Sequence, residues 1–169
     1  MYDISDCGLL IVAYARAGNV KQIINTAKSA GVKRIYIALD ISENDSDIQE
    51  QQIQIRDLVF HSMSQTDVSI NLLERTSNIG CSANLLSGVD WVFEFEDYVA
   101  VVEDDCLPVK DFYSLILKSR VRLETDANIW IVGGTQLMPR ATDGRAVLSR
   151  YPITWGWATT RSKWAEIRS

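Results

Sequence analysis

The chain has 169 residues, the length of one average domain, and is 47% hydrophobic and 23% charged, a composition that excludes disorder over most of its length. Its 22 acidic and 17 basic residues give a formal net charge of −5, which disfavours a nucleic acid or an anionic membrane as the main partner. No apolar run approaches the roughly 20 residues that span a bilayer, and three distant cysteines predict neither a disulfide framework nor a zinc site.

Most of the chain alternates short apolar runs with helical patterns. The apolar runs predict strands over residues 9–14, 34–39, 68–73 and 98–102. The segments between and after them predict helices over residues 20–30, 48–59, 82–93 and 110–123. Asn19 is the expected cap of the first helix, and Gly31 its stop signal. This alternation implies right-handed crossovers, and therefore an α/β fold with a mainly parallel central sheet and helices on both faces.

The last third of the chain departs from this rhythm. Residues 129–132 predict a fifth strand, and a loop rich in Arg, Gly and Pro begins at Thr135. An aromatic segment follows over residues 151–157, and the final helical pattern reaches Ser169 without a stop signal. We therefore expect residues 1–169 to form a single domain that is truncated at its C-terminus.

Three consecutive acids, Glu103-Asp104-Asp105, follow the strand predicted at residues 98–102. Open α/β sheets bind ligands at the carboxyl ends of their strands, and adjacent carboxylates repel one another unless a cation neutralises them. Mg²⁺ and Mn²⁺ take oxygen ligands, often one or two carboxylates together with substrate phosphates. The triplet therefore predicts a clamp for a metal-bound diphosphate, and a solvated acidic turn is the alternative.

The segment after the first strand, Ala13-Tyr14-Ala15-Arg16, lacks the G-x-G-x-x-G pattern of a dinucleotide site, which disfavours NAD and FAD. An arginine at this turn can still reach a phosphate, aided by the positive end of the following helix. Asp40, at the end of the second strand, can accept hydrogen bonds from a ribose or a base. An ordinary surface turn remains the alternative for both residues.

The aromatic segment contains Trp155-Gly156-Trp157. Exposed indoles stack on the apolar faces of sugar rings, and a glycine between them lets a ligand approach the backbone. The segment therefore predicts a sugar site, with tryptophans packed in the core as the alternative.

Several segments together resemble one family. VAVVEDDCLPVKDFYSL resembles the metal-binding motif of GT-A glycosyltransferases in its Glu-Asp-Asp form, as in family-2 and N-acetylglucosaminyltransferase I-like bacterial sugar transferases. YPITWGWATTRSKW resembles the WGWATW-type segment of the bacterial members, and RTSNIGCSANLLSGVDWVFE and IVAYARAGNVKQIINTA resemble the segments that precede the metal strand. The resemblance covers nearly all of the chain. It implies a GT-A enzyme that moves a sugar from a nucleotide-diphosphate donor, expected to be a UDP-sugar, to a hydroxyl acceptor with inversion.

The resemblance implies a role for each matching residue. Asp105 would be the direct ligand of Mn²⁺ or Mg²⁺, while Glu103 and Asp104 would contact the ribose or metal-bound water. The other donor-binding positions would be Ala13, Arg16, Asp40 (reading the base), Arg75, Asn78 and Gly80. The acceptor side of the sugar pocket would be shaped by Trp155, Gly156 and Trp157. The catalytic base is expected beyond Ser169, so the activity of this segment alone stays open.

Two other functions remain open at this stage. A nucleotidyltransferase that builds a nucleotide-sugar would also place a cation beside acids, but AYARAGN lacks the glycine-rich basic loop that such an enzyme needs. A non-catalytic α/β domain would use the acidic triplet only as a turn. The expected partners are a nucleotide-sugar donor and a glycan or other hydroxyl acceptor. The expected location is cytoplasmic, with peripheral attachment to the inner membrane as an option.

Overall fold

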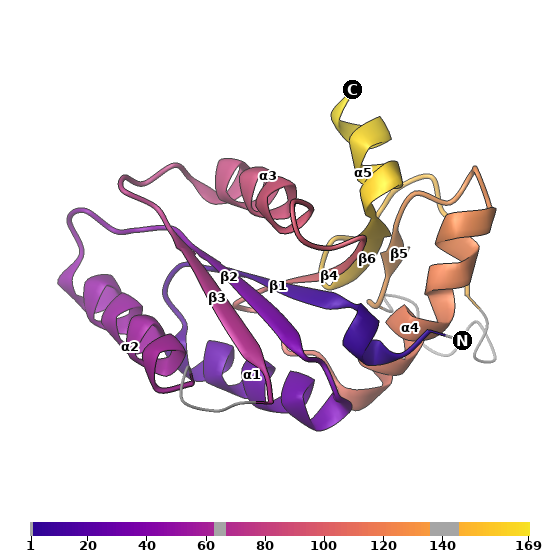
Figure 1. The fold of residues 1–169 in the computed structure, drawn as a ribbon. Coiled ribbons are helices and arrows are strands. Elements are labelled where there is room, and N and C mark those ends of the chain that lie inside the picture. The colour runs from indigo at the N-terminus through magenta and orange to yellow at the C-terminus, as the bar shows by residue number, and fades with distance from the viewer. Residues whose placement is uncertain (1, 63–66, 136–145) are drawn as a thin grey trace.

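The computed structural model describes residues 2–62, 67–135 and 146–169 (Figure 1). Within these residues, six strands and five α-helices follow a short 3-10 turn at Ile4–Asp6. The strands are β1 (Gly8–Ala13), β2 (Arg34–Leu39), β3 (Ser69–Glu74), β4 (Tyr98–Glu103), β5 (Val132–Gly133) and β6 (Trp157–Thr160). The helices are α1 (Ala17–Ala30), α2 (Ser46–Ser62), α3 (Cys81–Val92), α4 (Lys110–Thr125) and α5 (Arg161–Arg168).

The strands form one mixed sheet in the order β3-β2-β1-β4-β6-β5. The pairs β3-β2, β2-β1 and β1-β4 are parallel, whereas β6 runs antiparallel to both β4 and β5. The predicted α/β fold with a mostly parallel sheet is therefore confirmed, and the arrangement is Rossmann-like.

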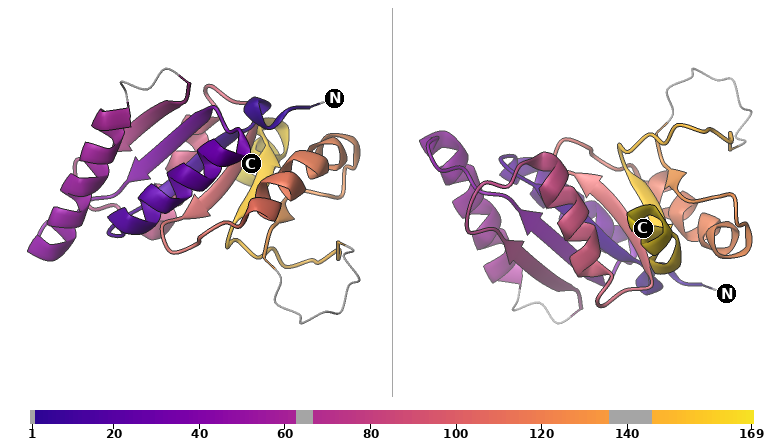
Figure 2. Two further views of the ribbon diagram at one scale, coloured as in Figure 1. Left: turned by 90° about the horizontal axis from the view of Figure 1, so that it is seen from below. Right: turned by 90° about the horizontal axis from the view of Figure 1, so that it is seen from above.

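Side-chain alternation along the strands divides the interior into two cores, one on each face of the sheet. Leu9 and Ile11 of β1 point toward the face that is covered by α1, α2 and α4. Leu10 and Val12 point toward the face that is covered by α3 and α5. Figure 2 shows these two helical layers from below and from above. Because both faces are covered, β1 is buried along its whole length, as its continuous apolar run predicts.

The bounds of the predicted elements lie within three residues of the observed ones, and the differences at α1 and β5 involve contacts near the site. Helix α1 begins at Ala17, and Asn19 lies inside it, where its amide reaches the backbone oxygen of Asp104 at 2.8 Å. The fifth strand, predicted at residues 129–132, is observed at Val132–Gly133, and before it the Trp130 carbonyl accepts a hydrogen bond from the Thr159 hydroxyl at 2.7 Å.

Strand β6 was not expected, because the segment around Trp157 reads only as an aromatic cluster. It lies between β4 and β5, where Trp157 and Ala158 alternate into the two cores. Most of the loop predicted after Thr135 lies outside the described residues.

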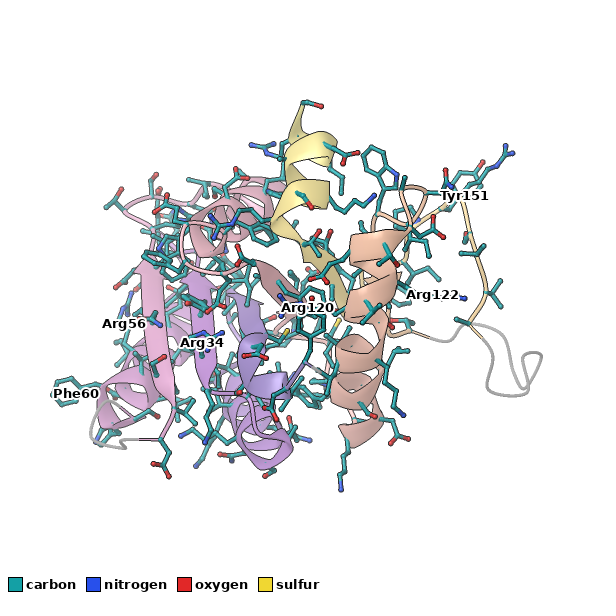
Figure 3. The ribbon with its side chains drawn as sticks, turned by 45° about the vertical axis from the view of Figure 1, so that its right-hand side comes forward. Arg34, Arg56, Phe60, Arg120, Arg122 and Tyr151 are labelled. Atoms are coloured by element: carbon teal, nitrogen blue, oxygen red, sulfur yellow. The ribbon has the colours of Figure 1, made fainter. Side chains whose placement is uncertain are left out.

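Figure 3 labels six side chains around the molecule. Arg56 of α2 pairs with Glu74 of β3 at the outer edge of the sheet, and Arg120 of α4 lies over the Tyr2 ring at 4.0 Å. Phe60 and Tyr151 project into solvent, with 73% and 82% of their surface exposed.

Candidate functional site

The carboxyl ends of β1, β2 and β4 bring together the first set of predicted residues. Ala13 ends β1, and its backbone oxygen accepts a hydrogen bond from the Asp40 N–H at 3.0 Å. Glu103 ends β4 and lies opposite Val12 of β1. Three segments that are distant in sequence therefore meet at one edge of the sheet, where α/β folds bind ligands.

Strand alternation sends the three acids of the triplet in different directions. Glu103 points toward α3, where its carboxylate lies 3.7 Å from the Cys81 sulfur. Asp104 turns the other way, into the loop between β1 and α1, and is 4% exposed. The Asp105 side chain is 54% exposed. The triplet is therefore not one cluster of equivalent ligands.

The Asp104 carboxylate has hydrogen-bond donors at both oxygens. Its Oδ2 accepts from the backbone N–H groups of Tyr14, Ala15 and Arg16 at 2.8, 3.0 and 3.3 Å. Its Oδ1 accepts from the Arg16 guanidinium at 2.6 Å. The hydrogen bond to Asp104, followed by the charge of that carboxylate, raises the pKa of Arg16. The carboxylate is thus held by protein groups on both sides.

Glu103 and Asp105 are the two acids of the triplet that such contacts do not saturate. Burial, and after it the charge of Asp105, raises the pKa of Glu103. The Arg16 guanidinium lies 4.0 Å from Asp105, a distance that leaves this carboxylate open to other partners. Burial, and after it the neighbouring Asp105, raises the pKa of the Cys106 thiol to about 11, which disfavours the reactive thiolate form at neutral pH.

Asp40 is also buried, and it organises the loop between β3 and α3. Its carboxylate accepts from the N–H groups of Ile79 and Gly80 at 3.1 and 2.9 Å, and from that of Ile41 at 3.0 Å. Gly80 has a φ of +81°, a conformation that favours glycine, and the Asn78 side chain accepts from the same Gly80 N–H at 3.0 Å. The residues predicted to read the donor are thus packed against one another.

The Arg75 side chain is turned toward α3. Its guanidinium donates to Asn84 Oδ1 at 3.0 Å and to Ser87 Oγ at 2.6 Å. Burial lowers its pKa from the ordinary value. Arg75 is therefore held beside the loop rather than paired with an acid of the triplet.

A cavity of about 440 Å³ opens beside Asp105, between the β4–α4 loop and the ends of β5 and β6. Its lining includes Leu107, Val109, Phe112, Thr135 and Trp155. Gly134 also lines it, and a side chain at that position would collide with the Phe112 ring. The cavity combines one exposed carboxylate with largely apolar walls.

The three residues of the aromatic segment separate in the structure. Trp155 is 59% exposed, and it lines the cavity together with Gly156. Trp157 is 2% exposed, lies in the core beside Trp164, and does not line the cavity. Its indole N–H is the one buried side-chain polar atom without a partner among the described residues. Of the two indoles, therefore, only that of Trp155 is placed to meet a ligand in this cavity.

The carboxylates at this site can hold a divalent cation only if a bound ligand, such as a phosphate, supplies further oxygen atoms to it. In the described part of the chain, no group of three or more His, Cys, Asp or Glu side chains is arranged to hold a metal ion. Mg²⁺ in phosphate sites is held by one or two carboxylates, with phosphate and water completing its shell. Asp105 supplies one such carboxylate, while the Asp104 oxygens already accept four hydrogen bonds.

The supporting roles of two residues were missed from the sequence. Asn19, expected only as a helix cap, holds the backbone of Asp104, as described above. Gln52 of α2 is 1% exposed and donates to the backbone oxygens of Tyr14 and Asp40 at 2.9 and 3.1 Å. A buried amide in an otherwise polar helix gives no sequence signal, because its role depends on two loops that only the fold brings near it.

Comparison with known protein families and with curated proteins finds no match to this chain. Within the described residues, no helix is both long and apolar enough to cross a membrane.

Proposed function

We propose that this chain carries the donor site of a metal-dependent glycosyltransferase, which moves a sugar from a nucleotide diphosphate to a hydroxyl acceptor. The observation that carries the proposal is the position of Asp105. This carboxylate is exposed at the carboxyl edge of a Rossmann-like sheet, and it borders a cavity whose wall includes the exposed indole of Trp155. The GT-A resemblance of the acidic triplet and of the WGWATT segment assigns the same two positions to metal and sugar.

In this proposal Asp105, supported by Glu103, holds Mn²⁺ or Mg²⁺ against the donor diphosphate. The cation, when bound, offsets the charge that develops on the leaving diphosphate. Trp155 offers its ring face to a sugar, and Leu107, Val109 and Phe112 supply apolar surface in the same cavity. Arg16 lies 4.0 Å from Asp105, where its charge attracts the diphosphate.

The test is a calorimetric titration of UDP into the full chain, with Mn²⁺ and again with EDTA. The proposal expects saturable binding that requires the metal. Asp105→Asn removes the carboxylate charge at an exposed position, so binding weakens by at least about tenfold while the free energy of unfolding stays within about 0.5 kcal/mol of the wild type.

Asp67→Asn is the matched control, because Asp67 is an exposed acid that precedes β3, at the opposite edge of the sheet. This variant should bind UDP as the wild type does. UDP binding that survives EDTA and Asp105→Asn, or no binding in any condition, would reject the proposal.

A further inference from the structure

The loop between β1 and α1 has the form of an anion-binding site. The consecutive N–H groups of Tyr14, Ala15 and Arg16 converge on one oxygen atom, within 3.3 Å. They lie directly before α1, whose N-terminus adds positive potential. Converging N–H groups at this position bind phosphate in many α/β proteins. Here they surround a carboxylate that belongs to the protein itself.

The register of the sheet explains how Asp104 reaches this loop. Strand β4 lies beside β1, and Val12 pairs with Glu103, so the next residue of the chain arrives beside the loop that follows β1. The Asp104 N–H donates to the Val12 oxygen at 3.0 Å, and the Asn19 amide donates to the Asp104 oxygen at 2.8 Å. Both the backbone and the side chain of Asp104 are therefore fixed to the β1–α1 segment.

The other oxygen of the Asp104 carboxylate, Oδ1, orients the positively charged side chain of Arg16. The Arg16 guanidinium donates to Asp104 Oδ1 at 2.6 Å, and the same nitrogen lies 4.0 Å from Asp105. The Arg16 side chain is 52% exposed, whereas that of Asp104 is 5% exposed. One buried carboxylate thus closes the loop and directs an exposed guanidinium toward the third acid.

We propose that Asp104 is a positioning residue that serves as an internal anion: it occupies the N–H site of the β1–α1 loop and aims Arg16 at Asp105. Both of its oxygens accept hydrogen bonds from the protein itself, so in this proposal Asp104 is not a ligand of the cation or of the ribose. This last consequence rests on the proposed function, but the filling of the loop by a carboxylate does not. The diphosphate of a donor is accordingly excluded from the N–H site of the β1–α1 loop, and it would meet the protein through the cation on Asp105 and the Arg16 guanidinium.

The test of the internal anion is chemical rescue in the full chain. Asp104→Gly removes the carboxylate and leaves room for a small anion among the same N–H groups. We expect the midpoint of thermal unfolding to fall by about 5–10 °C. Sodium formate should restore about half of that loss in a saturable way, whereas sodium chloride at equal ionic strength should not.

Asp67→Gly is the control for general effects of salt and of glycine. Formate should shift its midpoint no more than it shifts that of the wild type. Equal formate responses in Asp104→Gly, Asp67→Gly and the wild type would overturn the proposal.

A milder variant keeps the test decisive if Asp104→Gly does not fold. Asp104→Asn retains one acceptor oxygen but loses the charge, so the amide proton resonances of Tyr14, Ala15 and Arg16 should move upfield together in NMR spectra. Unchanged resonances at those three positions would contradict the internal anion. This readout needs neither metal nor nucleotide, so it stands even if UDP does not bind.

The consequence for the cation is tested by UDP titration with Mn²⁺. If Asp104 only positions Arg16, Asp104→Asn weakens binding by a few-fold, whereas Asp105→Asn weakens it by at least about tenfold. Equal losses in the two variants would make Asp104 a ligand and overturn this part of the proposal. Absence of UDP binding in the wild type would instead reject the proposed function alone.

Discussion

Buried carboxylates are stabilised in different ways at the amino edge of the sheet, where the parallel strands begin, and at its carboxyl edge, where they end. At the amino edge, Glu96 is 3% exposed and accepts from the Tyr36 hydroxyl at 2.7 Å and from the Arg34 guanidinium, including a contact at 2.9 Å. At the carboxyl edge, Asp104 and Asp40 accept mainly from backbone N–H groups of loops. Side chains satisfy the charge at one edge, and loops do so at the other.

This difference shows that the need of a buried charge for hydrogen-bond partners can both stabilise the fold and shape a candidate site. A buried charge needs partners at either edge. Where rigid strands supply the partners, as for Glu96, the result is a closed cluster that leaves nothing for a ligand. Where loops supply them, the carboxylates shape the loops, and Asp105 remains exposed between them. The amino edge should therefore contribute to stability alone, whereas the carboxyl edge should contribute to both stability and binding.

The largest expected effect is the loss of the amino-edge cluster. Glu96→Ala leaves the Arg34 guanidinium and the Tyr36 hydroxyl without their shared acceptor, so the free energy of unfolding should fall by about 3–5 kcal/mol in urea titrations. Glu94→Ala, an exposed acid two residues away, should change it by less than about 0.5 kcal/mol. A loss of under about 1 kcal/mol in Glu96→Ala would remove the contrast between the edges.

A smaller effect of opposite sign is expected at the carboxyl edge. Burial and the charge of Asp105 raise the pKa of Glu103 above its ordinary value of 4.5, so its charged form is disfavoured in the folded state. Stability should therefore decrease as pH rises through 4.5 toward the raised pKa, and stay lower above it. Glu103→Gln removes this cost and should raise the unfolding midpoint by about 1–3 °C at neutral pH.

The pH dependence sharpens that prediction. Well below pH 4.5 the wild type is neutral at this position in both the folded and the unfolded state, as Glu103→Gln is at any pH, so their unfolding midpoints should converge. Glu94→Gln is the control and should show no such pattern. A Glu103→Gln variant that is less stable than the wild type at neutral pH would mean that the carboxylate is needed by the fold.

The smallest expected effect is a difference in the reactivity of thiols at the two edges. Burial raises the pKa of Cys7, which precedes β1, to about 12. Partial burial and the charge of Glu103 also raise the pKa of Cys81 at the start of α3, but this side chain is exposed to the reagent. Iodoacetamide should alkylate Cys81 at least about tenfold faster than Cys7 in the folded chain, as mass spectrometry can measure. In urea the two rates should become similar. Equal rates in the native state would show that the amino edge opens readily.

Hydrophobic pattern predicted most of the fold. The continuous apolar runs of β1 and β4 identify strands that are covered on both faces, and they are buried in that way. Strand β6 was missed because Trp157–Thr160 has no such run and gains its partners from β4, far away in the chain. A strand that is defined by its neighbours has no local signature.

The location of the candidate site could be predicted from the sequence, but the directions and contacts of its side chains could not. The sequence placed Asp40 and the acidic triplet at the ends of strands, where they lie. The residue pattern alone did not separate Asp104 from Asp105, because adjacent acids look alike until register gives each a direction. The family resemblance did separate them, but it predicted a contact of Asp104 with ribose or metal-bound water and not its hydrogen bonds to the β1–α1 loop. The sequence also did not separate Trp155 from Trp157, one of which is exposed and the other buried.

The antiparallel insertion of β6 has a consequence for how the chain folds. Strands β1, β2, β3 and β4 all lie before residue 104, whereas β6 begins at residue 157. The four parallel strands are therefore complete before β6 is synthesised. Because folding during synthesis proceeds from the N-terminus, we expect these four strands to assemble first during synthesis. The wall of the cavity that contains Trp155 would then be completed last.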